Sequence, residues 1–114
     1  MKVIIAGSRD CEDYEALLEA IRLSGFEITE VVSGCARGAD KLGERWGEEA
    51  GIHVERFPAD WNKYGKGAGT IRNTKMAEYG EALIALWDFQ SRGTKNMIKQ
   101  ARARGLQVFV HKVR

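Results

Sequence analysis

Short apolar runs alternate with amphipathic stretches along the whole chain, and this alternation limits the folds that the chain can adopt. Five runs have the length and composition of β-strands: residues 2–6, 28–33, 52–57, 82–87 and 106–111. The first and the fourth are almost wholly apolar, as expected for strands that are covered on both faces. A chain that alternates strands and helices in this way forms a parallel sheet with right-handed crossovers and helices on both faces.

The stretches between these runs carry the apolar spacing of helices that bury one face. Helices are predicted over roughly residues 14–21, 39–50, 70–79 and 94–104. Asp10 or Asp13 is expected to cap the first helix, and Asp40 the second. Four glycines follow the helices, where a left-handed residue is expected: Gly25, Gly51, Gly80 and Gly105. Gly43 and Gly47 are expected to let the second helix pack closely on the sheet.

We therefore predict a Rossmann-like, three-layer α/β sandwich with five parallel strands in the order 3-2-1-4-5. Residues 1–114 are expected to form one domain, because separate cores need a longer chain and no linker or repeat divides this one. No run approaches the ~20 apolar residues of a membrane span, and the start of the chain is interpreted as a buried strand rather than a secretory signal. Two cysteines without a CxxC spacing predict neither a disulfide framework nor a metal site, and a cytoplasmic location is expected.

Charge is distributed unevenly along the chain, although the net charge is only +2. Residues 89–114 contain seven Lys or Arg and no Asp or Glu, whereas residues 1–88 carry a net charge of −5. A basic end can indicate contact with nucleic acid. The preferred interpretation is a solvated helix face followed by a basic terminal strand.

Three turns are expected to meet beyond the carboxyl ends of the strands, where strand order reverses between the first and the fourth strand. They comprise residues 7–10, 33–40 and 88–94, and each combines a glycine, a small hydroxyl residue and an arginine before a helix. Glycine allows a ligand to approach the backbone, helix-start N–H groups attract anions, and the arginine fork matches phosphate oxygens. The three turns therefore predict a site for a phosphate-bearing ligand.

The segment over residues 57–76 is expected to form a fourth wall, because it is longer and more polar than an ordinary connection. Arg72 is expected in the first turn of the following helix, within reach of an anion. Trp61 and Tyr64 either stack on a base or anchor the loop, and the second interpretation is preferred. Trp87 is interpreted as a core residue with one edge toward the crevice.

The residues expected to contact the ligand are Gly7, Ser8, Arg9, Ser33, Gly34, Arg37, Gly38, Asp40, Arg72, Asn73, Trp87, Asp88, Ser91, Arg92, Gly93 and Thr94. The anion itself is expected on the N–H groups of Gly93 and Thr94, beside Arg9 or Arg72. No metal and no obligatory cofactor are expected.

Four motifs in this order resemble the YspA-like family of the SLOG superfamily of bacteria and phages: GSRD, VVSGCARGADKLGE, FPADWNKYGKGAGTIRNTKMAE and ALIALWDFQSRGTKNMI. The superfamily joins the DNA-processing protein A fold with the LOG ("lonely guy") phosphoribohydrolases. The resemblance covers nearly the whole chain and implies a Rossmann-like domain that binds nucleotides or nucleotide-derived ligands, as sensors in bacterial conflict systems do. SGCARGAD is similar to SGxARGID of DNA-processing protein A, which implies the same phosphate-binding turn. The resemblance also implies a homo-oligomer.

The chain departs from the LOG pattern where catalysis would need it. LOG hydrolases pair an arginine in an RKxxM-like helix with a glutamate in a PGGxGTxxE-like turn. Arg72, Asn73 and Met76 resemble the first element, but Asn96 or Met97 stands where the second would be acidic. Cleavage of an N-glycosidic bond needs a carboxylate, which an asparagine cannot replace.

Binding is therefore preferred over phosphoribohydrolase activity. Four carboxylates remain near the site: Asp10, Asp40, Asp60 and Asp88. Asp40 is interpreted as a helix cap, so Asp88 and Asp10 are the weak candidates for an acid–base group. Asp88 is alternatively expected to accept a hydrogen bond from a ribose hydroxyl or to form the turn. Single-stranded DNA binding through Arg37, Arg92 and the basic stretch is a further alternative, disfavoured because aromatic and basic residues do not alternate along a strand.

Overall fold

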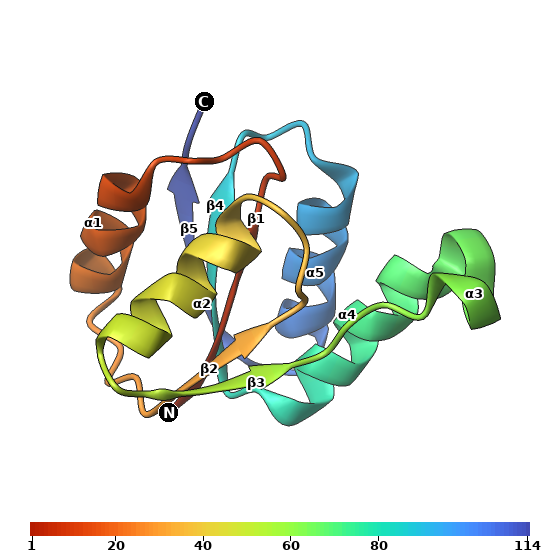
Figure 1. Ribbon diagram of the computed structural model, residues 1–114, viewed down its shortest axis with the longest axis horizontal. Helices are drawn as coiled ribbons and strands as arrows, with labels where there is room; N and C mark the ends of the chain where they lie inside the picture. Colours follow the sequence, from red (N-terminus) through yellow and green to blue (C-terminus); the bar gives the residue numbers. More distant parts are fainter.

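The computed structural model describes residues 1–114 and contains a five-stranded parallel sheet in the order β3-β2-β1-β4-β5 (Figure 1). The elements are β1 (Lys2–Gly7), α1 (Tyr14–Ser24), β2 (Glu30–Ser33), α2 (Ala39–Glu49), β3 (His53–Arg56), α3 (Trp61–Tyr64), the 3₁₀ turn η1 (Gly65–Gly67), α4 (Ala68–Tyr79), β4 (Ala82–Trp87), α5 (Arg92–Ala103) and β5 (Gln107–Lys112). The predicted fold class and strand order are confirmed. None of the helices combines the length and the hydropathy that crossing a membrane requires.

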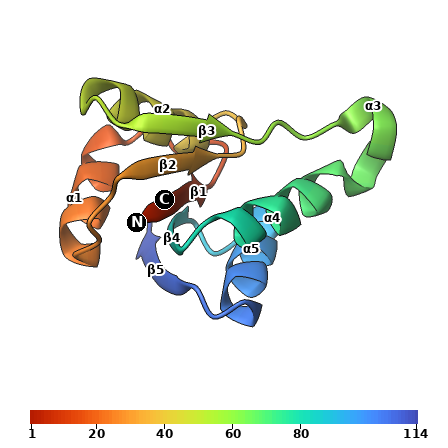
Figure 2. The same cartoon turned by 90° about the horizontal axis from the view of Figure 1, so that it is seen from below.

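Two apolar layers form because successive residues of a strand point to opposite faces of the sheet. Val3 and Ile5 of β1 pack in the layer formed with α1 and α2. Ile4 and Ala6 pack in the other layer, with α4 and α5. Figure 2 shows the two helix pairs on opposite sides of the sheet. The inner residues of β1 and β4 are buried, which explains their almost wholly apolar sequences.

The four glycines that follow helices are required for two different physical reasons. Gly25, Gly51 and Gly105 have the predicted left-handed backbone, with φ of 68°, 70° and 75°. The prediction is wrong for Gly80, whose φ is −77°. A Cβ atom at Gly80 would lie 2.8 Å from Cγ1 of Ile4, so close packing on β1 is what requires a glycine there.

The segment after β3 is more helical than the sequence predicts. Residues 61–67 form α3 and η1, and α4 begins at Ala68 rather than near Thr70. The carboxylate of Asp60 accepts the N–H of Lys63 at 3.1 Å and caps α3. Figure 1 shows α3 at the far end of α4, away from the sheet. Because α4 starts early, Arg72 lies in its second turn and not in the first.

The structure shows which residues cap the N-termini of α1 and α2. Asp13 caps α1 by accepting the N–H of Ala16 at 3.0 Å. The predicted cap of α2 is wrong, since Gly38 occupies the N-cap position without a side-chain hydrogen bond. Asp40 is the second residue of the helix, and its carboxylate accepts the N–H of Ala36 at 3.2 Å. Asp40 therefore closes the turn that precedes α2.

Substitution of Gly43 by alanine tests the close contact of α2 with the sheet. A Cβ atom at Gly43 would lie 2.8 Å from Cβ of Ile5, inside the core. Gly43→Ala is expected to lower the free energy of unfolding by about 1–3 kcal/mol, because overpacking forces the helix outward. Urea unfolding followed by circular dichroism measures the change. Gly67→Ala is the matched control, since no atom lies within 4 Å of its Cβ position; a larger loss for the control would contradict this account.

Candidate functional site

The three predicted turns meet at the buried residue Ser8, which is 2% exposed. Its N–H donates to the carbonyl of Leu86 at 2.9 Å, and its carbonyl accepts the N–H of Ala39 at 3.2 Å. Its hydroxyl oxygen accepts the N–H of Asp88 at 3.1 Å. Ser8 therefore joins the turns that follow β1, β2 and β4, and its polar groups are used within the protein.

Two glycines allow these turns to lie so close together. Gly38 has φ 80° and ψ −128°, and a Cβ atom there would lie 2.4 Å from the carbonyl oxygens of Ser8 and Arg9. A Cβ atom at Gly7 would lie 2.1 Å from the carbonyl oxygen of Leu86. Any side chain at either position would force the turns apart.

The turn after β2 is held by a buried hydroxyl. Ser33 donates from Oγ to Oε2 of Glu44 at 2.6 Å and accepts the N–H of Cys35 at 3.1 Å. Burial opposes ionisation of Glu44, but the Ser33 hydroxyl, Lys41 and Arg56 outweigh it and hold the pKa of this carboxyl below its ordinary value. Ser33 is fully buried and positions the turn, including Cys35 with its left-handed φ of 65°.

A hollow of about 260 Å³ lies at the reversal between β1 and β4, and we call it the switch-point hollow. Its predicted lining residues are Gly7, Arg9, Asp40, Arg72, Asn73, Ser91, Arg92, Gly93 and Thr94. Its further lining residues were not predicted and are small or apolar: Ala6, Ala36, Met76 and Met97. Both methionines lie on helices that pack on the sheet, where no sequence signal separates a core residue from one that lines a site.

Arg72 is half-buried in this hollow and forms no ion pair. Its Nη1 donates to the carbonyl of Gly34 at 2.8 Å, and its Nε donates to Oδ1 of Asn73 at 3.1 Å. None of the ion pairs in the structure includes Arg72, Arg9 or Arg92. Burial lowers the pKa of Arg72, and the nearby charge of Asp40 offsets part of this effect. A partly buried cation without an ion pair gains free energy when an anion binds beside it.

The start of α5 forms the opposite wall of the hollow. Asn73 donates from Nδ2 to the carbonyl of Gly93 at 3.2 Å and to Oδ1 of Asn96 at 3.1 Å. Ser91 caps α5 by accepting the N–H of Thr94 at 3.3 Å. The sequence predicted that this N–H would bind the anion, but it is already used within the protein. The N–H groups of Arg92 and Gly93 have no acceptor within the protein. The free donors of this helix start are therefore one residue earlier than the sequence suggests.

Asp40 is the single carboxylate that lines the switch-point hollow, and it is 5% exposed. Burial raises the pKa of Asp40 to about 6, against the opposing effects of the Ala36 N–H and of Arg72. A buried carboxyl with a pKa near neutrality is a group that can hold or release a proton in a binding site. The sequence predicted Asp40 as a ligand contact. It did not predict the raised pKa, because burial of a helix residue depends on the tertiary structure.

The two carboxylates predicted as acid–base candidates lie outside this hollow. Asp88 accepts the N–H groups of Gln90 and Ser91, both at 2.8 Å, and these hydrogen bonds lower the pKa of Asp88. Of the roles predicted for Asp88, these contacts correspond to that of forming the turn. Asp10 is exposed and pairs with Arg37 at 3.4 Å, a surface contact of little energetic weight. Trp87 donates from Nε1 to the carbonyl of Ser91 at 3.0 Å and supports the same turn as Asp88.

A second hollow of about 400 Å³ adjoins the first, and we call it the side hollow. It shares Arg9, Ala36 and Arg72 with the switch-point hollow. Its other lining residues are Gly34, Cys35, Arg37, Pro58, Ala59 and Trp61. Trp61 is 51% exposed, and Cη2 of its ring lies 3.5 Å from the Cβ position of Gly69 on α4, so stacking on a base and anchoring of the segment both stay predictions.

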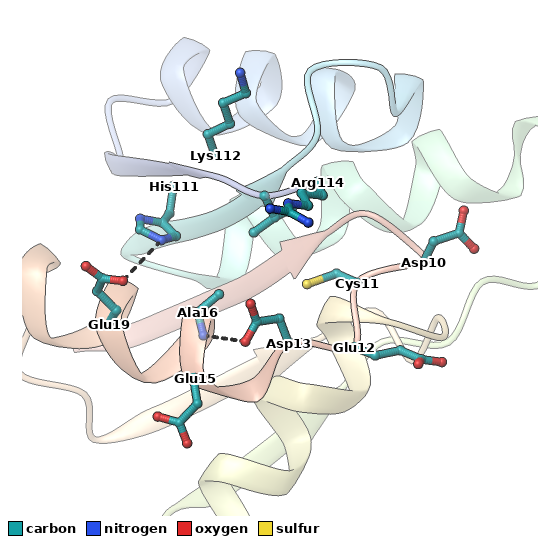
Figure 3. A pocket seen from close by; sticks show the side chains of 11 residues that line it. Asp10, Cys11, Glu12, Asp13, Glu15, Ala16, Glu19, His111, Lys112 and Arg114 are labelled. Carbon is teal, nitrogen blue, oxygen red and sulfur yellow. Dashed lines mark hydrogen bonds and ion pairs between the residues drawn. The ribbon is translucent and has the colours of Figure 1, made fainter.

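The largest hollow, of about 690 Å³, lies elsewhere, between the start of α1 and the end of β5 (Figure 3). Its acidic lining residues are Asp10, Glu12, Asp13, Glu15 and Glu19. His111, Lys112 and Arg114 lie across from them on the β5 side. The excess of carboxylates disfavours a phosphate group there, and Asp10 is the single predicted site residue that lines it. The smaller switch-point hollow is therefore the candidate site.

The fold and this arginine-lined hollow at the strand-order reversal define a Rossmann-like domain with a cationic edge. A family model described as "YspA, cpYpsA-related SLOG family" matches residues 1–64. The Gene 61 protein of Mycobacterium phage D29 is 34% identical to the chain over 117 residues, which cover 94% of this chain and 93% of that protein. The chain belongs to the YspA, cpYpsA-related SLOG family.

A solved structure shares the architecture. The DNA processing protein A of Streptococcus pneumoniae superposes with a TM-score of 0.76 at 19% sequence identity. The match covers 96% of this chain and 49% of that protein, so the chain spans about half the length of this structural neighbour. At this identity the likeness establishes the fold, which agrees with the predicted one.

Substitution of Asp40 by asparagine tests the buried carboxyl through the pH dependence of stability. The pKa of about 6 in the folded state lies above the ordinary value of 3.8, so ionisation costs free energy only in the folded chain. This cost is absent below about pH 4, grows up to about pH 6 and stays constant above it. Asp40→Asn is therefore expected to raise the free energy of unfolding by about 1–3 kcal/mol at neutral pH and to leave it unchanged near pH 4.

Urea unfolding at a series of pH values measures this effect. Asp88→Asn is the control with the opposite sign, because the pKa of Asp88 is lowered and its ionised form stabilises the fold above its ordinary pKa. Equal effects of Asp40→Asn at both ends of the pH range would contradict the assignment of a raised pKa.

Proposed function

We propose that the chain binds the phosphate group of a nucleotide or nucleotide-derived ligand in the switch-point hollow. The observation that carries the proposal is Arg72, a half-buried guanidinium that no carboxylate neutralises. Arg9 and Arg92 line the same hollow, against the single carboxylate of Asp40. This balance of charge favours an anion.

The available donors are of the kinds that bind phosphate oxygens. An arginine fork binds two phosphate oxygens at once, and a helix start adds backbone N–H groups and a favourable dipole. The N–H groups of Arg92 and Gly93 at the start of α5 supply such donors. Asp40 in its protonated form adds an O–H donor, and in its ionised form it accepts a hydroxyl of a sugar.

The proposed role is retention of the ligand, as in sensing, carrying or sequestering a nucleotide-derived molecule. Membership in the YspA, cpYpsA-related SLOG family and the fold shared with DNA processing protein A support a ligand related to nucleotides or nucleic acids. Asn96 or Met97 stands where the LOG turn would be acidic, and Oδ1 of Asn96 accepts a hydrogen bond from Asn73. A retained ligand needs no carboxylate at that position.

Cleavage of an N-glycosidic bond is the second candidate function, and the observation that favours it is Asp40. A buried carboxyl with a pKa of about 6 has the properties of an acid–base group in such a reaction. Incubation with nucleoside monophosphates and chromatography of the products test this candidate. Release of free base that Asp40→Asn abolishes supports hydrolysis, and absence of free base removes it.

Substitution of the hollow's arginines tests the phosphate site. A charge-assisted hydrogen bond contributes about 1.5–3 kcal/mol, so Arg72→Ala is expected to weaken nucleotide binding roughly ten- to a hundredfold. Isothermal titration against nucleoside monophosphates, nicotinamide and ADP-ribose nucleotides, cyclic nucleotides and a short oligonucleotide measures the affinity. Steep salt dependence confined to the oligonucleotide would indicate nucleic-acid binding instead.

Two further variants separate binding from folding. Arg72 also holds the carbonyl of Gly34, so Arg92→Ala, at an exposed residue, is the variant with less effect on the fold. Arg45→Ala is the matched control, because Arg45 pairs with Glu49 on α2 and lies outside both hollows. Normal binding by both hollow variants, or no ligand bound more tightly than millimolar, would overturn the proposal.

A further inference from the structure

The side hollow continues from the switch-point hollow, because Arg9, Ala36 and Arg72 line both. A ligand with an anionic group beside Arg72 therefore has room to extend past the turn after β2 toward α3. The volumes of about 260 Å³ and 400 Å³ together fall within the range of small-molecule sites. The second space is larger than a phosphate group needs.

Trp61, on α3, is the one aromatic residue that lines the side hollow. The ring lies against α4, since a Cβ atom at Gly69 would be only 3.5 Å from Cη2 of Trp61. About half of this residue nevertheless remains exposed. An aromatic ring that is positioned by its own element and left open to a hollow provides a stacking surface.

The remaining lining suits a flat, uncharged ring attached to an anion. Four of the lining residues are small or rigid: Gly34, Ala36, Pro58 and Ala59. No carboxylate lines the side hollow, whereas Arg9, Arg37 and Arg72 do. The chemistry therefore combines an aromatic platform with cations along one wall.

We infer that the side hollow is a nucleobase subsite, in which Trp61 stacks on the base of a nucleotide whose phosphate lies in the switch-point hollow. This inference rests on the proposed function and adds the residue that recognises the base. Stacking on an aromatic ring tolerates every base, because each base has a π-face. Trp61 thus separates nucleotides from sugar phosphates that lack a base.

Phe89 provides a matched control on the same edge of the sheet. It is 52% exposed, similar to Trp61, and it also follows a strand. Its ring packs on Trp87 with centroids 4.7 Å apart, and it lines neither hollow. Loss of an exposed aromatic residue in general is therefore distinguishable from loss of the stacking surface.

The experiment compares the four nucleoside 5′-monophosphates with ribose 5-phosphate, which keeps the phosphate and lacks the base. Trp61→Ala is expected to weaken nucleoside monophosphate binding about tenfold or more, since alanine substitution of a stacking residue has effects of this size. Binding of ribose 5-phosphate is expected to stay unchanged. Trp61→Phe is expected to restore most of the nucleotide affinity, and Phe89→Ala to leave both affinities unchanged.

Other outcomes overturn the inference in distinguishable ways. Equal losses for both probes in Trp61→Ala would show that Trp61 only orders the segment around α3. Unchanged nucleotide affinity in this variant, or ribose 5-phosphate binding as tightly as nucleotides to the unmodified chain, would remove the base subsite and leave the phosphate site standing. Failure of both probes to bind the unmodified chain would overturn the proposed function as well.

Discussion

The hydrogen bonds of one buried serine hold the functional edge of this domain together. Ser8 receives an N–H from the first residue of α2 and another from the turn after β4, while its own N–H bonds the carbonyl of Leu86. Buried backbone groups that lack partners cost about 1–3 kcal/mol each, so separation of the turns would carry a large penalty. Arg9 and Arg37 are thus mounted on turns that are locked to each other, and the turn after β4 leads directly into Arg92, which is the condition for a preorganised site.

The electrostatics of the site depend on two charged groups that stabilise each other without forming an ion pair. Asp40 favours the charged form of Arg72, and Arg72 favours ionisation of Asp40, yet burial still disfavours the charge on each. Neither group is neutralised by the other, and the surplus positive charge of Arg9 and Arg92 faces the same space. The acidic hollow beside α1 has the opposite balance, so its charge and that of the switch-point hollow favour ions of opposite sign.

Sequence reasoning reached the strand order and the meeting of the three turns, because strand periodicity and turn composition are local properties. It missed α3, since a helix of four residues has too little periodicity to recognise and depends on the cap at Asp60. The conformation of Gly80 and the burial of Asp40 were likewise out of reach, because contacts with Ile4 and with the preceding turn decide them. The exposure of Trp61 depends on where α4 places α3, which no short segment of sequence encodes.

Helix α4 holds both sides of the switch-point hollow through two adjacent residues. Arg72 bonds the carbonyl of Gly34 and Asn73 bonds the carbonyl of Gly93, so movement of either segment away from α4 would break a hydrogen bond. The side hollow has a different boundary, since α3 forms its outer wall and none of the residues of α3 is buried. The frame therefore combines a hydrogen-bonded opening with an exposed wall. In the proposed binding mode, substitutions in this exposed wall would change which end of a ligand fits there, while the sheet and the arginine cluster stay as they are.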